Sequence, residues 1–140
     1  AEPPNPMLAP YRRDYPNDAE RPGVDLSLAM LAEMRRASEA AGARFLLVTI
    51  DSHASQEALW RAMLAHPDVR AEDYDRDHAE ALLGAFAERE GFPVLHLAET
   101  LRAHADEALF FETDPHFTAL GHARAAEAVA LRLRELGWTN

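Results

Sequence analysis

Residues 114–122 read DPHFTALGH, the most informative stretch of the chain. It lies between the last apolar segment and a long helical pattern. Pro115 is expected to stiffen the spacing between Asp114 and His116, and Thr118 to cap the following helix. A rigidly held histidine beside a carboxylate suits general-base activation of a hydroxyl. The residues therefore predict an acid–base pair in a loop; the alternative is a turn-capping aspartate beside a surface imidazole.

Outside this block, the hydrophobic pattern predicts helices that alternate with short strands. Residues 45–50 and 94–97 are apolar runs without alternation, as expected of parallel strands buried on both faces. Helical patterns cover residues 26–41, 56–65, 78–90, 98–104 and 118–136. This order is typical of an α/β fold with a parallel sheet. Since stable sheets usually have about four to six strands, the fold is expected to be incomplete in this chain.

Particular residues have expected roles inside these helices. Ser55 stands where it could cap the helix over residues 56–65. Gly121 would let the first turn of the last helix approach another backbone closely. Met34 and Leu120 fall on the apolar faces of their helices, so both are expected to be buried.

Residues 1–24 hold most of the prolines and show no hydrophobic periodicity. Because proline fixes φ and lacks a backbone donor, we expect an extended arm or linker there, and an α/β domain over residues 25–140. The first residue is alanine, not methionine, which fits a mature end left by signal peptidase or the edge of a fragment.

Composition excludes several classes of function. The 140 residues carry a formal net charge of −10, and no run of basic residues interrupts the acidic surface. Such a chain repels phosphate backbones and anionic lipid, so we expect neither nucleic-acid nor membrane-surface binding. There is no cysteine, which excludes disulfides and thiolate chemistry but leaves the redox compartment open. No apolar stretch approaches the roughly 20 residues that span a bilayer.

Metal binding and cofactor binding are not expected either. Asp73, Asp75 and Asp77 alternate like part of a calcium loop, but the glycine and the terminal glutamate of an EF-hand are absent. A solvated acidic loop is the better interpretation. The histidines outside the 114–122 block are scattered and lack the spacing of metal ligands.

The stretch DPHFTALGH, with Ala-Ala-Glu at residues 125–127, strongly resembles the final block of SGNH/GDSL-type hydrolases. It is most similar to the branch with alginate O-acetyltransferase-type and related membrane-associated esterase-like proteins, where the block reads roughly Asp-x-His-Trp-Thr-x-x-Gly-His. Phe117 replaces the tryptophan here. The resemblance implies a three-layer, flavodoxin-like α/β fold. It also implies that His116 is the base, that Asp114 is its partner, and that His122 packs or forms hydrogen bonds.

The resemblance also implies a Gly-Asp-Ser nucleophile block and oxyanion blocks, which should precede residue 26 and are absent there. Ser52 follows a predicted strand and looks like such a turn without its glycine. Only about sixty residues separate it from His116, too few for the intervening strands and oxyanion blocks, so we interpret Ser52 as an ordinary loop serine.

Two functional hypotheses follow. In the first, the chain is the C-terminal part of an SGNH ester hydrolase or O-acyltransferase, and a serine in a missing N-terminal half or a partner protein completes the site. The substrate would be an acylated glycan or a small ester, the location periplasmic or extracytoplasmic, and the isolated chain inactive. In the second, it is a non-catalytic SGNH-like subunit or scaffold within a larger, membrane-associated complex. An upstream strand with Gly-Asp-Ser in the complete coding sequence would favour the first.

Overall fold

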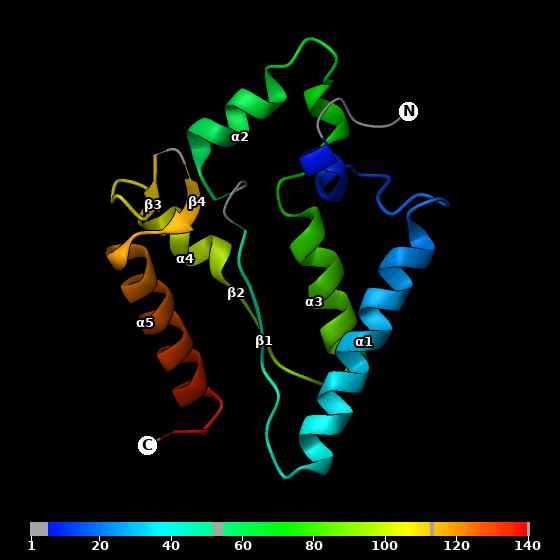
Figure 1. Ribbon diagram of the computed structural model, residues 1–140, viewed down its shortest axis with the longest axis vertical. Helices are drawn as coiled ribbons and strands as arrows, with labels where there is room; N and C mark the ends of the chain where they lie inside the picture. Colours follow the sequence, from blue (N-terminus) through cyan, green and yellow to red (C-terminus); the bar gives the residue numbers. More distant parts are fainter. Residues whose placement is uncertain (1–5, 52–54, 113, 140) are drawn as a thin grey trace. The chain divides into compact units, whose positions relative to one another are not determined.

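The computed structural model describes residues 6–51, 55–112 and 114–139, shown in Figure 1. They form two compact units, residues 1–47 with 63–94 and residues 48–62 with 95–140. In chain order the elements are η1 (Pro6–Tyr11), α1 (Arg21–Ala40), β1 (Leu47–Thr49), α2 (Glu57–Leu64), η2 (Ala71–Asp73), α3 (His78–Glu90), β2 (Val94–His96), α4 (Leu97–Ala103), β3 (Phe110–Phe111), β4 (Asp114–Phe117) and α5 (Ala119–Glu135). The expected alternation of helices and short strands is confirmed.

The core of the first unit lies between α1 and α3, which run side by side (Figure 1). Ala32 of α1 packs with Phe86 of α3, and Phe92 follows directly after α3. The Phe86 and Phe92 rings meet edge to face with centroids 5.9 Å apart, a preferred aromatic geometry. Gly91 ends α3 with φ at 75°, a left-handed conformation that glycine adopts without strain.

The described residues of the expected extended arm, 6–24, are folded instead. Leu8 in η1 is completely buried, and α1 already begins at Arg21 with Pro22 in its first turn. The buried guanidinium of Arg12 donates two hydrogen bonds to Glu20, at 2.8 and 3.1 Å. The segment therefore has core contacts and an ion pair, which the proline-rich composition did not reveal.

Backbone hydrogen bonds also tie this segment to the chain before α3. Asp75 N donates to Tyr11 O at 2.7 Å, and Arg13 N donates to Asp73 O at 2.9 Å. His78 Nε2 donates to the carbonyl of Tyr15 at 2.7 Å. These contacts span about sixty residues of sequence, so no local pattern could predict them.

The core of the second unit lies around α4. Leu97, Leu101 and Leu109 are buried together. Half-buried apolar side chains from the strands and from α5 pack against them: Val48, Leu95, Phe110, Phe117, Ala125 and Ala128. Small alanines on α5 allow that helix to lie close to this cluster.

Strands β1 and β2 pair in a small parallel sheet, which confirms the expected α/β class. Leu47 N donates to Pro93 O at 3.1 Å, and Thr49 Oγ1 is hydrogen bonded to His96 Nδ1 at 2.8 Å. The expectation of burial on both faces is wrong, because both strands are half-buried and Ile50 is 59% exposed. Among the described residues this sheet has two strands, so each is an edge strand.

Three expectations about single helix residues are also wrong. Met34 is 55% exposed and Leu120 is 40% exposed, because the buried positions of their helices are Ala32 and Gly121. Ser55 does not cap α2. That helix begins at Glu57, which leaves Gln56 at the cap position, and the Ser55 hydroxyl has no hydrogen-bond partner among the described residues.

Candidate active site

The 114–122 block begins in a β-hairpin, although the sequence predicted a loop. Strand β4 pairs antiparallel with β3, so that Phe110 lies opposite Phe117 and Phe111 opposite Asp114, with an irregularity between the two β3 residues. The Phe110 and Phe117 rings lie with centroids 5.1 Å apart. This aromatic cross-strand pair stabilises the hairpin, whose strands are too short to show an alternating pattern in the sequence.

His116 lies in β4, one residue before Phe117, and its side chain is exposed. The backbone of Asp114 belongs to the same strand, but its side chain lies outside the described part of the chain. The predicted contact between Asp114 and His116 therefore stays a prediction. Residues 115 and 116 lie between the paired positions 114 and 117, where the register is irregular, so regular strand alternation does not apply to this pair.

Thr118 joins the hairpin to α5. Its Oγ1 accepts a hydrogen bond from Gly121 N at 3.2 Å, so the predicted N-cap is confirmed. The same hydroxyl donates to the Ala108 carbonyl at 2.6 Å, and Thr118 N donates to Leu109 O at 2.9 Å. One residue thus fixes the end of β4 against the segment that enters β3.

Gly121 lies against the same segment. It is buried, and a Cβ built at this position would collide with the carbonyl of Leu109. The predicted close approach of backbones is therefore confirmed. His122, the next residue, places its ring edge to face with Phe117 at 5.5 Å between centroids, in agreement with its expected packing role.

An ion pair that the sequence did not reveal connects α5 to the loop before β3. Arg124 Nη2 and Nε donate to the Glu107 carboxylate at 2.6 and 2.8 Å, and Arg124 Nη1 donates to Glu127 at 3.0 Å. The hydrogen bonds that Arg124 donates lower the pKa of Glu107, and acceptance of these bonds by Glu107 and Glu127 raises the pKa of Arg124. Seventeen residues separate Glu107 from Arg124, beyond the range of a helical spacing rule.

The other candidate residues do not come together into a site. Ser52 and His53 lie outside the described residues. In the acidic loop, Asp75 pairs with Arg13 at 3.0 Å. Within residues 6–51, 55–112 and 114–139, no group of three or more histidine or acidic side chains could hold a metal ion. Over the same ranges, every helix is too short or too polar to cross a bilayer.

The described residues thus form an α/β arrangement with an exposed histidine on a strand that is fixed to the last helix. Residues 10–140 match the family described as "SGNH hydrolase-like domain, acetyltransferase AlgX", and the chain belongs to that family. The resemblance drawn from DPHFTALGH is thereby confirmed. Neither a curated protein nor a solved structure matches the sequence.

Proposed function

We propose that the chain supplies the acid–base pair of an SGNH-type ester hydrolase or O-acyltransferase, for a serine that lies outside these 140 residues. The observation that carries the proposal is the placement of His116, exposed on a strand whose end is fixed by Thr118 and Gly121. Membership of the SGNH hydrolase-like, AlgX acetyltransferase family supports the reaction class. A base must be accessible, and the exposed side chain of His116 supports this role.

In the proposed mechanism the external serine attacks the ester carbonyl while His116 accepts its proton. The imidazolium then returns that proton to the leaving alcohol, and an acyl-enzyme remains. Asp114 orients the imidazole and stabilises its charged form. Water or an acceptor hydroxyl next attacks the acyl group, with His116 again as base. Hydrolase and transferase differ only in that acceptor, and an acylated glycan or a small ester is the proposed substrate.

The proposed location is extracytoplasmic. It follows from the resemblance to alginate O-acetyltransferase-type proteins. Fractionation of cells that express the complete coding sequence tests this, and recovery with cytoplasmic markers would contradict it.

A non-catalytic subunit is the second candidate, and specific observations favour it. Leu26, Met30 and Met34 recur every fourth residue on α1 and are all exposed. Together with the two-stranded sheet, this leaves apolar surface that a partner, or another part of a longer chain, could cover.

Covalent labelling separates the two candidates. We expect residues 1–140 alone to give no burst of product from p-nitrophenyl acetate, because loss of one oxyanion donor alone typically costs about 10²–10³ in rate. The full-length protein should be labelled stoichiometrically by a fluorophosphonate at a serine outside the chain. Labelling at Ser52 in the isolated chain would overturn the assignment of the nucleophile. A full-length protein that is never labelled would favour the subunit.

A further inference from the structure

Helix α1 has two apolar faces. One face packs toward α3 inside the first unit (Figure 1), where Leu28 and Leu31 contact the core around Ala32. The opposite face, which we call the outer face of α1, is apolar and exposed; it carries Leu26, Ala29, Met30, Met34, Ala37 and Ala40. A helix with apolar residues on all sides is normally buried between two layers, so the outer face is expected to have a partner.

The charges on and beside the outer face are unevenly placed along the helix. Glu33 lies within the face, and Arg36 donates to it from Nε and Nη2 at 3.0 and 2.8 Å, which neutralises that carboxylate. Asp25 lies beside the N-terminal half of the face and is exposed. Arg36 follows eleven residues later, about three helical turns, and so lies on the same flank as Asp25. One flank of the outer face is thus acidic at one end and basic at the other.

This arrangement of charge is complementary to itself in the antiparallel direction. When two copies of α1 lie antiparallel about a two-fold axis, Asp25 of each copy faces Arg36 of the other, so two ion pairs form together. Nη1 of Arg36 takes no part in the bonds to Glu33, so it can donate to this second carboxylate. Parallel helices would place Asp25 beside Asp25 instead. The same antiparallel register brings the two Met30 side chains together and places Met34 opposite Ser27.

Ser27 lies at the edge of a groove beside the outer face. The groove has a volume of about 640 Å³, lies within the first unit, and is lined mainly by apolar side chains of α1 and α3, among them Leu31 and Leu82. Gly23 also lines it, and a Cβ built there meets nothing within contact distance, so this edge is open. A methionine side chain is flexible and fits irregular apolar space. Met34 of a second copy is therefore placed to fill the groove.

We propose that the outer face of α1 binds the same face of a second copy, as an antiparallel two-fold pair of helices. The interface is small, so the expected dissociation constant is about 10–100 μM. The monomer already leaves these side chains exposed, so substitutions there change association and not the folding of the monomer. Neither Asp114 nor His116 takes part, so the pairing holds or fails independently of the proposed function.

Sedimentation equilibrium of the full-length protein tests the pairing. We expect a reversible monomer–dimer equilibrium in the micromolar range. Asp25→Lys and Arg36→Glu should each raise the dissociation constant at least about tenfold, because two-fold symmetry turns both ion pairs into repulsions. An equimolar mixture of the two variants should associate more tightly than either variant by itself, since opposite charges meet again in the mixed dimer. A defect in folding would not be repaired by mixing.

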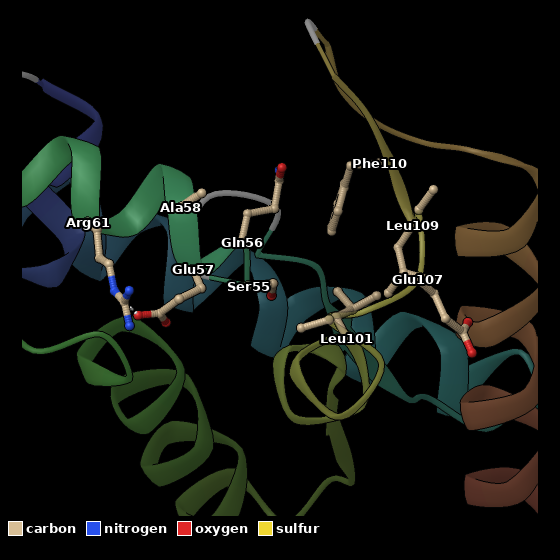
Figure 2. A pocket seen from close by; sticks show the side chains of 11 residues that line it. Ser55, Gln56, Glu57, Ala58, Arg61, Leu101, Glu107, Leu109 and Phe110 are labelled. Atoms are coloured by element: carbon tan, nitrogen blue, oxygen red, sulfur yellow. Dashed lines mark ion pairs between the residues drawn. The ribbon is translucent and has the colours of Figure 1, made fainter.

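Glu57→Lys and Arg61→Glu are the matched controls, because they change the net charge by the same amounts. These two residues pair with each other at 2.6 Å on α2, in the second unit (Figure 2). Both control variants should dimerise like wild type. A protein that stays monomeric at about 500 μM would overturn the proposal and assign the outer face to another protein or to another part of a longer chain. A mixture no tighter than the single variants, or equal weakening by the controls, would overturn the pairing through α1.

Discussion

Gly121 determines how closely the first turn of α5 approaches the segment before β3, and so helps to position the candidate site. The first turn of α5 can lie against the Leu109 carbonyl only because this position has no side chain. Thr118 hydrogen bonds to the same segment, and Phe117 packs on both Phe110 and His122. Small changes at Gly121 should therefore move the strand that carries His116.

Gly121→Ala tests this close approach. Alanine in a helix normally stabilises by up to about 1 kcal/mol relative to glycine, but here its methyl group would force the backbones apart. We expect a net loss of about 1–3 kcal/mol in the free energy of unfolding, measured by urea denaturation. Gly23→Ala is the control, since a Cβ there meets nothing within contact distance. Equal stability of the two variants would contradict the role of Gly121.

At the scale of elements, residues 6–20 show how a proline-rich segment can belong to a core. The burial of Leu8 and the Arg12–Glu20 pair join η1 and the start of α1, and hydrogen bonds from Asp75 and His78 close the contact. The segment is therefore expected to unfold with the rest of its unit, not before it.

Leu8→Ala measures how strongly this segment is held. Removal of a completely buried leucine side chain should cost about 2–5 kcal/mol in the free energy of unfolding. Leu26→Ala is the matched control, because Leu26 is 63% exposed on α1, and its effect should stay within about 0.5 kcal/mol. Denaturation followed by circular dichroism gives both values. Equal, small losses would show that residues 6–20 contribute little, as a loose arm would.

The Glu107–Arg124 pair, which joins two elements, is expected to make the thermal stability of the protein depend on pH. Because the folded state lowers the pKa of Glu107, its stabilising effect is fully present above the ordinary glutamate pKa of 4.5 and is lost as pH falls through the lowered value. Glu107→Gln should thus melt a few degrees below wild type at neutral pH. The difference in melting temperature between the two proteins should disappear under acid conditions well below pH 4.5. Thermal melts from neutral pH to below pH 4.5 measure this difference. A difference that stays constant with pH would contradict the pairing.

The sequence predicted the elements whose signals are local. Helix α3 was predicted over 78–90 and ends at Gly91 because its apolar period and its glycine are both visible in the sequence. The Thr118 cap and the close approach at Gly121 were likewise predictable from residue type and position. The hairpin β3–β4 was not, because strands of two and four residues are too short for an alternating pattern. Contacts such as Glu107–Arg124 depend on the tertiary fold and have no local signal.

At the scale of the whole molecule, the net charge limits which partners the protein can bind, and the small size of the parallel sheet limits how much surface it buries. A net charge of −10 disfavours polyanionic partners, and a sheet of two parallel strands offers little buried surface for its size. Both properties agree with the proposal that the chain acts on uncharged esters and is completed by further protein. Family membership supplies the reaction class, and His116 is the residue on which the proposed chemistry depends.

The rate of ester hydrolysis by the full-length protein, compared between two histidine variants, tests that dependence most directly. We expect His116→Ala to lower kcat/KM for p-nitrophenyl acetate by at least about 10³-fold, because the serine loses its base. His122→Ala should retain most of the activity, since His122 packs against Phe117 and takes no part in the proposed proton transfer. If His116→Ala keeps wild-type kcat/KM while remaining folded, His116 is not the base and the account of this site is wrong.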